Sequence, residues 1–266
     1  MTRHSPPSLR PPLFISHGAP DVYLLDTPAH RAMRALGEGH PPSAYVVISA
    51  HWQSGRLEIT SETNPRTIHD FRGFGPVLDA AHYDAPGDPV LAETIRDRLH
   101  DAGLEAHLNP TRGRDHGSWI PLGLIRPQAD IPVLQISLPR VSDQDSISLG
   151  RALAPLAFED IQLIGSGALT HSLADSLSAP EQAPPYAFAK AFRDALLPAI
   201  QSGDPVALAG WETAPHAIRN HPTPEHFRPL LVAMAAGGGG EADCLHHSWS
   251  RGALAMDIWR FTPPSP

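Results

Sequence analysis

The chain has 266 residues, of which 41% are hydrophobic and 18% are charged, a composition that predicts a globular protein rather than a disordered one. Its formal net charge of −8 leaves no basic excess to neutralise phosphates, so nucleic acid is excluded as an expected partner. The single cysteine, Cys244, excludes a disulfide framework and metal sites built from cysteine.

The N-terminal residues 1–11 are rich in proline and polar side chains and lack the apolar core of a signal peptide. No stretch approaches the roughly 20 apolar residues that a membrane-spanning helix requires. We therefore expect a disordered tail over 1–11, a single domain over 12–262, a cytoplasmic location and no membrane partner.

Apolar runs of strand length recur along the chain, and several are nearly continuous, as in strands that are covered on both faces. These runs span residues 13–16, 44–50, 57–60, 133–138 and 161–165. Helical apolar spacing is found at residues 27–36, 89–102, 145–157, 186–201 and 224–236. Alternating strands and helices predict an α/β fold, with a central mixed, largely parallel β-sheet and helices on both faces.

Three of the sixteen histidines follow predicted strands. His17 comes directly after residues 13–16, His51 after 44–50, and His171 after 161–165 and a predicted Gly-Ser-Gly turn at 165–167. Ligands of open α/β sheets bind at the carboxyl ends of the strands. Any one of these histidines alone is explained by a backbone hydrogen bond at a strand end, but three at one edge favour a metal site.

Two further histidines are candidates for the same site. His116 follows Asp115, which is able to orient a neighbouring group, and His226 lies in the first turn of the helix predicted over 224–236. Imidazole ligands suit Fe, Zn, Cu or Ni, so the ligand type narrows the metal without fixing it. The sequence lacks the dinucleotide fingerprint, the phosphate-binding P-loop, the helical zinc motif and the serine-hydrolase elbow.

Seven short motifs, in order along the chain, resemble those of the DODA-type class III extradiol ring-cleaving dioxygenases of the LigB-like superfamily. The resemblance extends from about residue 12 to 261. Within the superfamily, the chain is most similar to the bacterial 4,5-DOPA dioxygenase-like proteins. The resemblance implies a LigB-like catalytic domain over residues 12–262. The motifs are FISHGAP at 14–20, ISAHW at 48–52, HDFRGF at 69–74, YDAPG at 83–87, DHGSWIPL at 115–122, GSGALTH at 165–171 and HPTPEH at 221–226.

The resemblance implies a role for each candidate histidine. His17, His51 and His226 match metal ligands, with a histidine where the wider superfamily often carries a carboxylate. Glu225 is adjacent to His226, so a carboxylate in place of the third histidine stays open as a metal ligand. His171 matches either a fourth metal ligand or the acid–base catalyst, and both roles stay open. His116 matches a candidate catalytic histidine that either supports the metal ligands from behind or faces the substrate, and both positions stay open.

The resemblance also implies the cofactor and the partners. One divalent metal per chain is expected, Fe(II) for dioxygenase activity, with Zn(II) as an alternative bound metal. The implied partners are O₂ and a catechol-type, DOPA-like substrate, whose ring takes up both oxygen atoms and opens to a muconic semialdehyde. A homodimer is the expected assembly. Side-chain type, rather than the resemblance, suggests the substrate-binding residues. Core packing is the alternative for the four aromatic ones, and simple exposure is the alternative for the arginine: Trp52, Phe71, Phe74, Trp119 and Arg72.

Two other functions stay open at this point. A zinc-dependent hydrolase, or another Lewis-acid enzyme on the same scaffold, needs only a metal with one open coordination position. A non-catalytic metal-binding protein is the second alternative, and it is disfavoured because an inactive descendant has no chemical reason to keep every candidate histidine.

Overall fold

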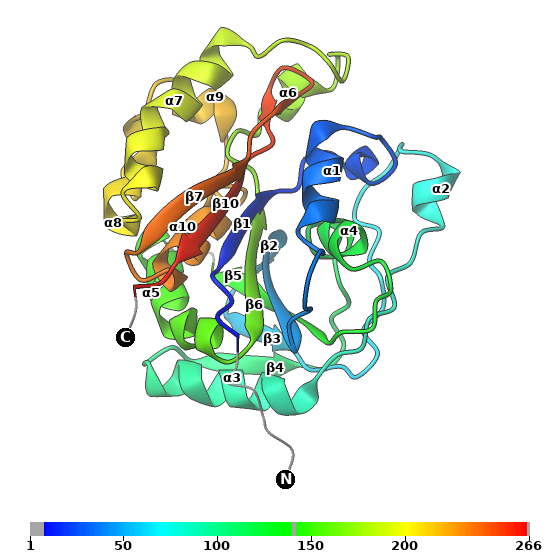
Figure 1. The fold of residues 1–266 in the computed structure, drawn as a ribbon, viewed down its shortest axis with the longest axis vertical. Helices are drawn as coiled ribbons and strands as arrows, with labels where there is room; N and C mark the ends of the chain where they lie inside the picture. Colours follow the sequence, from blue (N-terminus) through cyan, green and yellow to red (C-terminus); the bar gives the residue numbers. More distant parts are fainter. Residues whose placement is uncertain (1–7, 140–141, 265–266) are drawn as a thin grey trace.

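The structure is a computed structural model that describes residues 8–139 and 142–264. An eight-stranded sheet in the order β4-β3-β5-β2-β6-β1-β10-β7 forms its centre (Figure 1). The strands are β1 (Leu13–Ser16), β2 (Ala44–Ser54), β3 (Leu57–Thr60), β4 (Ala106–Asn109), β5 (Val133–Pro139), β6 (Ile161–Gly167), β7 (Glu241–His246) and β10 (Ile258–Thr262). A separate hairpin pairs β8 (Trp249–Ser250) with β9 (Leu254–Ala255).

The four central strands β5, β2, β6 and β1 are all parallel to one another. Antiparallel pairing occurs toward the edges, where β10 joins β1 to β7 and where β3 meets β5. The predicted α/β fold with a mixed, largely parallel sheet is therefore confirmed. The parallel arrangement matters for function because it places the carboxyl ends of β1, β2 and β6 side by side.

Helices cover both faces of the sheet, as predicted. Alternate residues of β2 show this directly, because Tyr45 and Val47 pack into one core while Val46 and Ile48 pack into the other. The first core includes residues of α1 (Pro28–Ala35) and α4 (His116–Ile125). The second core includes residues of α3 (Pro89–Asp101), α5 (Asp143–Leu153) and α10 (Arg228–Ala236).

The remaining helices are one long helix and several short ones. The longest of them, α7 (Ala187–Gln201), runs along the β7 side of the sheet (Figure 1) and packs Phe192 and Leu196 into a third core with α10. The short ones are η1 (Pro20–Tyr23), α2 (Pro76–Asp79), η2 (Ala154–Phe158), α6 (Leu173–Ser176), α8 (Pro205–Leu208), η3 (Trp211–Thr213) and α9 (Ala217–Asn220).

Local sequence explains where the predicted helices begin. The Thr27 side chain accepts a hydrogen bond from the backbone N–H of His30 at 3.1 Å, and Asp88 accepts one from Leu91 at 2.9 Å. Each cap is followed by a proline in the first turn, where a missing N–H costs nothing. Helix α5 begins two residues earlier than predicted and gives way to η2 after Leu153.

Two predictions near the site are wrong. The Gly-Ser-Gly segment at 165–167 is not a turn, because it continues β6 and pairs with both β1 and β2. The helix predicted over 224–236 begins only at Arg228. His226 lies in the preceding turn, where its carbonyl accepts a hydrogen bond from the N–H of Ala168 at 2.8 Å instead of a helical one.

Helix α4 and the strands β4, β7 and β10 were not predicted. All ten residues of α4 are buried, so its sequence carries no polar face from which helical spacing is read. At the N-terminus, residues 1–7 lie outside the described residues. Arg10, which was expected in the tail, packs with the domain through an ion pair with Asp160 at 2.7 Å. Among the described residues, no helix is both long and apolar enough to cross a membrane.

Candidate active site

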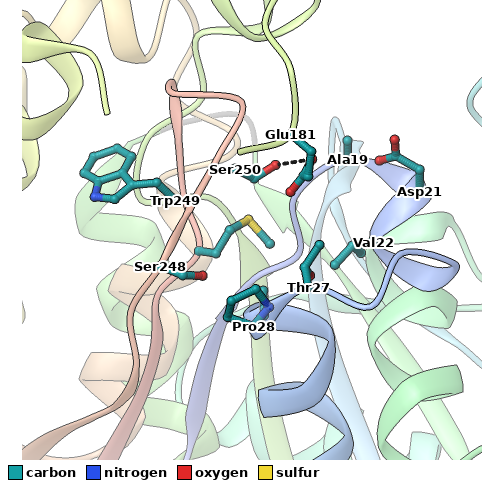
Figure 2. Close-up of a pocket in the computed structure, with 11 residues that line it drawn as sticks. Ala19, Asp21, Val22, Thr27, Pro28, Glu181, Ser248, Trp249 and Ser250 are labelled. Carbon is teal, nitrogen blue, oxygen red and sulfur yellow. Dashed lines mark hydrogen bonds between the residues drawn. The ribbon is translucent and has the colours of Figure 1, made fainter. Parts of the chain in front are cut away.

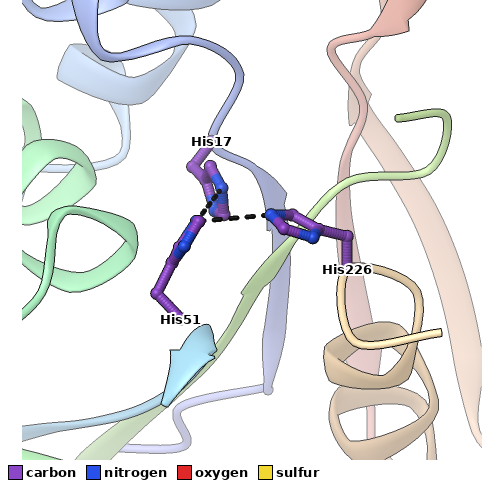
Figure 3. A group of neighbouring side chains, drawn as sticks. All are labelled: His17, His51 and His226. Atoms are coloured by element: carbon purple, nitrogen blue, oxygen red, sulfur yellow. Dashed lines mark hydrogen bonds between the residues drawn. The ribbon is translucent and has the colours of Figure 1, made fainter. Parts of the chain in front are cut away.

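Three histidines from distant parts of the chain meet at the carboxyl edge of the parallel strands (Figure 3). His17 follows β1, and His226 precedes α10. His51 lies inside β2, which is four residues longer than predicted, where its pairing with β5 is interrupted between Ile48 and Gln53. Such an interruption re-aims a side chain, and here it turns His51 toward the other two rings.

The three imidazoles direct the same atom at a common point. The Nε2 atoms of His17 and His51 are 3.2 Å apart, and those of His51 and His226 are 3.3 Å apart. A metal held at about 2.1 Å by two imidazoles separates their nitrogens by about 3.0 to 3.4 Å for octahedral to tetrahedral angles. The spacing therefore fits one metal ion that all three histidines share.

The opposite nitrogen of each ring faces an oxygen atom. His226 Nδ1 lies 3.1 Å from Oε1 of Glu225, His17 Nδ1 lies 2.9 Å from Oγ of Ser166, and His51 Nδ1 lies 3.6 Å from Oδ2 of Asp70. A carboxylate only accepts, so His226 donates from Nδ1 and keeps a lone pair on Nε2. Metal-bound histidines have this pattern, with an oxygen partner on the far nitrogen. The residues present thus fit a metal.

Burial keeps these imidazoles in the neutral form that binds metals. Loss of hydration lowers the pKa of His17 and of His226 well below the usual value, and the neighbouring histidines lower it further. The same loss of hydration, together with His116, lowers the pKa of His51 to about 3. All three imidazoles are therefore neutral at neutral pH, each with a hydrogen on only one of its two ring nitrogens.

His171 reaches the same site but does not belong to the group of converging nitrogens. Its ring stacks on the ring of His226, with 3.5 Å between centroids and 12° between planes. The lone pair of an imidazole nitrogen lies in the ring plane, so two parallel rings at this separation do not aim at one point. Burial, followed by His221, lowers the pKa of His171 to about 3.

His116 is oriented by Asp70, a residue that the sequence analysis did not single out. The Asp70 Oδ1 atom accepts hydrogen bonds from the backbone N–H of His116 at 3.0 Å and from its Nδ1 at 2.9 Å. Burial alone raises the pKa of Asp70, but these hydrogen bonds outweigh it and bring that pKa to about 2. The only sequence signal for Asp70 was its place in the 69–74 motif.

Asp115 does not orient His116, although it precedes that residue in the chain. Its fully buried carboxylate accepts hydrogen bonds from Ser49 at 2.6 Å and from Arg112 at 3.1 Å, and it contacts the amide of Gln135. The Ser49 hydroxyl in turn accepts the backbone N–H of His51 at 3.1 Å. Asp115 therefore ties the start of α4 to the end of β2.

The histidines line a cavity of about 320 Å³ that has room for a single aromatic ring and its substituents. Phe71, Arg72 and Phe74 line the same cavity, as expected of substrate-binding residues. Trp52 and Trp119 do not line it. Trp52 follows His51 in β2 and so points to the opposite side, under Arg112. Trp119 is fully buried in α4 and donates its Nε1–H to the carbonyl of Ile68 at 3.1 Å.

A second arginine, Arg251, also lines this cavity, but its charge is already balanced. It forms an ion pair with Asp21, and its Nε lies 3.5 Å from a carboxylate oxygen of Glu181. These two acids also line a smaller neighbouring cavity, in which Ser250 donates to Glu181 at 3.0 Å (Figure 2). Arg72, by contrast, is exposed and has no paired carboxylate among the described residues.

Comparison with known proteins identifies the family. A family model described as the catalytic LigB subunit of aromatic ring-opening dioxygenase matches residues 13–256. The chain belongs to the LigB family. It is 38% identical over 263 residues to a 4,5-DOPA dioxygenase extradiol of Beta vulgaris, covering 96% of this chain and 97% of that relative. A protein of the same name from Escherichia coli K12 is 36% identical over 237 residues, covering 87% and 86%.

A solved structure agrees with this assignment. The crystal structure of an uncharacterized protein from Escherichia coli K12 matches this LigB-family chain with a TM-score of 0.80 and 30% sequence identity, covering 95% of this chain and 99% of that one. The predicted family and the predicted enzyme class, an extradiol ring-opening dioxygenase, are confirmed. Membership of this LigB family implies a metal, a small aromatic substrate and O₂.

Proposed function

We propose that this LigB-family chain is a metal-dependent extradiol dioxygenase that opens a catechol-type, DOPA-like ring to a muconic semialdehyde, inserting both atoms of O₂. The observation that carries the proposal is the convergence of three Nε2 atoms in the lining of a cavity of single-ring size. The relatives named 4,5-DOPA dioxygenase extradiol support the substrate class.

His17, His51 and His226 are the proposed metal ligands. Fe(II) is the proposed metal for activity, because it would supply the redox chemistry through which triplet O₂ reacts with a closed-shell catechol. Zn(II) suits the same three imidazoles but has no redox chemistry of its own. Three neutral ligands leave the full charge of the metal to favour ionised hydroxyl groups of the substrate.

His171 and His116 are the proposed acid–base residues. The parallel stacking of His171 on His226 supports a role as catalyst rather than as a fourth ligand. The lowered pKa of His171 means that its ring is neutral at pH 7, so one ring nitrogen has a lone pair that can accept a proton from a substrate hydroxyl. His116 donates Nδ1–H to Asp70, so its Nε2 is the nitrogen available to exchange a proton with substrate.

The cavity walls suit an aromatic amino acid. Phe71 and Phe74 lie edge to face at 5.7 Å between centroids and offer apolar contact to a ring. Arg72 is the proposed partner of a substrate carboxylate because its charge has no partner among the described residues, whereas that of Arg251 is balanced by Asp21 and Glu181.

Anaerobic reconstitution with Fe(II), followed by DOPA, catechol or protocatechuate in air, tests the proposed function. The expected result is O₂ uptake with DOPA and a yellow ring-fission product, and neither with Zn(II) in place of Fe(II). Bound iron without O₂ uptake for any catechol would favour the Lewis-acid hydrolase. Absence of both activities in metal-loaded protein would favour the non-catalytic metal-binding alternative.

Replacement of one ligand tests the site itself. His17→Ala removes one of three imidazoles, so both bound metal and turnover are expected to be lost. His107→Ala is the matched control, because His107 lies on the edge strand β4, outside the cavity. Metal content per chain is measured after desalting, together with O₂ uptake. Stoichiometric metal and full activity in His17→Ala would exclude the proposed site.

A further inference from the structure

Ser166 is a fully buried residue of β6 that touches a proposed metal ligand without facing the metal position itself. Among the described residues its Oγ atom has two hydrogen-bond partners, the backbone carbonyl oxygen of Gly117 and Nδ1 of His17, the latter at 2.9 Å. A hydroxyl carries one proton, so it donates to only one of the two. Which neighbour receives the proton decides which nitrogen of His17 carries a hydrogen.

The carbonyl of Gly117 is a free acceptor because of a proline. In an α-helix each carbonyl accepts from the N–H four residues later, and for Gly117 that residue is Pro121, inside α4. Proline has no N–H, so the helix leaves the Gly117 carbonyl without its usual donor. Both Gly117 and Ser166 are buried, and a buried carbonyl without a partner is costly.

The Ser166 hydroxyl supplies the missing donor. A carbonyl oxygen only accepts, so the contact between Ser166 and Gly117 uses the hydroxyl proton. The Ser166 oxygen is then left to accept from His17, which places the imidazole hydrogen on Nδ1. The lone pair of His17 consequently lies on Nε2, the atom that is 3.2 Å from Nε2 of His51.

We propose that Ser166 is a positioning residue, which holds His17 in the Nδ1–H tautomer through the Gly117 carbonyl that Pro121 leaves free. The inference rests on the proposed metal site, since it assigns the reason why His17 presents Nε2 to a metal. It also gives Pro121, in the middle of a buried helix, a role at a distance from the metal.

The tautomer is measured directly in metal-free protein. Long-range ¹H–¹⁵N spectra of ¹⁵N-histidine-labelled protein distinguish a protonated from an unprotonated ring nitrogen, and the His17 signals are identified by their loss in His17→Gln. We expect protonated Nδ1 in the native protein and a mixture of both tautomers in Ser166→Ala. A native His17 with its hydrogen on Nε2 would overturn the proposal.

Metal affinity is the second measurement. Loss of an oxygen partner behind a metal-bound histidine typically weakens binding about 10- to 100-fold, and we expect this for Zn(II) in Ser166→Ala, measured by chelator competition. Unchanged affinity together with an unchanged tautomer would overturn the proposal. Native protein with the expected tautomer but no Zn(II) binding would instead contradict the proposed metal site, and the tautomer assignment would stand.

Pro121→Ala distinguishes an effect on the His17 tautomer from a general loss of packing around Ser166. The new N–H at residue 121 competes for the Gly117 carbonyl, which frees the Ser166 hydroxyl to donate to His17 and shifts the hydrogen toward Nε2. Pro198→Ala is the matched control, because Pro198 is also inside a helix, α7, but is exposed and outside the cavity. A native tautomer ratio in Pro121→Ala would overturn the role given to the free carbonyl.

Discussion

At the scale of single residues, Arg72 and Arg251 bring the same charge to the cavity and differ in what surrounds it. The guanidinium of Arg251 lies between the carboxylates of Asp21 and Glu181, so its charge is already balanced within the protein. Arg72 is exposed at the cavity wall and forms no ion pair with a carboxylate among the described residues. Only one of the two arginines is therefore suited to recognise a substrate.

Arg72→Gln tests that distinction through substrate choice. Removing the cation is expected to lower kcat/KM for DOPA roughly tenfold, the size of one lost charged hydrogen bond at an exposed position. Dopamine lacks the carboxylate, so its kcat/KM is expected to stay within about twofold of the native value. The measurement is the ratio of the two values from initial rates of O₂ uptake.

Arg34→Gln, an exposed substitution on α1 outside the cavity, serves as the control for a general loss of charge. Equal losses for DOPA and dopamine in Arg72→Gln would show that Arg72 supports the loop rather than the carboxylate.

Residue-level prediction succeeded where the backbone fixes the side chain. His17 was found because a residue directly after a parallel strand has to lie at the ligand-binding edge. Asp70 was not found, since its contact with His116 depends on the path of the loop between β3 and α2. Trp52 was assigned to the cavity on residue type, and the alternation of side chains along β2 places it elsewhere.

At the scale of elements, α10 lies directly on β6, and two glycines permit the approach. A Cβ atom at Gly165 would clash with the carbonyl of Pro229, and one at Gly167 would clash with the carbonyl of His226. These glycines were interpreted from sequence as turn residues. Their actual role is to remove side chains where a helix and the turn before it meet a strand.

Gly167→Ala is expected to push the His226 turn away from β6 and to weaken metal binding. Overpacking of this kind costs about 1 to 3 kcal/mol of stability, because the clash is with backbone and not with a flexible side chain. Urea unfolding measures the loss of stability in metal-free protein, and chelator competition measures the affinity for Zn(II).

Gly55→Ala is the matched control, since a Cβ at Gly55 has no neighbour within 4 Å. Native affinity in a destabilised Gly167→Ala would show that the turn and the metal site are independent of this contact.

Element-level prediction depended on the presence of a polar face. The bounds of helix α3 were predicted to within one residue. Its buried residues Ala92, Ile95 and Leu99 recur at helical spacing, and the opposite side is polar and exposed to solvent. Helix α4 was not, because every residue in it is buried and Pro121 interrupts its sequence. The start of α10 was misplaced because Pro224 and Pro229 both suit a first turn, and only the bond between Ala168 and His226 decides between them.

At the scale of the whole molecule, buried histidines link stability to pH. His221 donates Nε2–H to the carbonyl of Leu169 at 3.0 Å, and its buried Nδ1 has no hydrogen-bond partner in the part of the chain that the structure describes. Burial lowers the pKa of His221 to about 4. Between about pH 6.5 and pH 4, His221 is therefore protonated in the unfolded chain and neutral in the folded chain.

Stability is consequently expected to be complete above pH 6.5 and to fall as the pH drops toward 4, with His221 alone contributing about 3 kcal/mol of that loss. Metal-free His221→Gln keeps a hydrogen-bond donor for the Leu169 carbonyl but has no side chain that gains a proton in this pH range. Its free energy of unfolding should therefore vary less steeply with pH than that of the native protein. Urea unfolding in chelator from pH 7.5 to pH 4.5 gives both slopes. Identical slopes for the two proteins would exclude this role of His221.

The fold class could be predicted because strands and helices alternate through the first two thirds of the chain. The last third was incomplete in the prediction, since β7 and β10 lack the continuous apolar runs of central strands. β7 is largely exposed at the edge of the sheet, and Arg260 interrupts β10. Neither strand has a pattern that separates it from loop by sequence alone.

The position of β1 in the sheet has a consequence for biosynthesis. β1 is synthesised before both of its neighbours, β6 and β10, which consist of residues 161–167 and 258–262. Until the last of these emerges, an apolar N-terminal strand has an open edge, a state that favours aggregation and engages chaperones. A chain cut before Ile258 would keep all five site histidines, and yet the edge of β1, the strand directly before His17, would stay without its β10 partner.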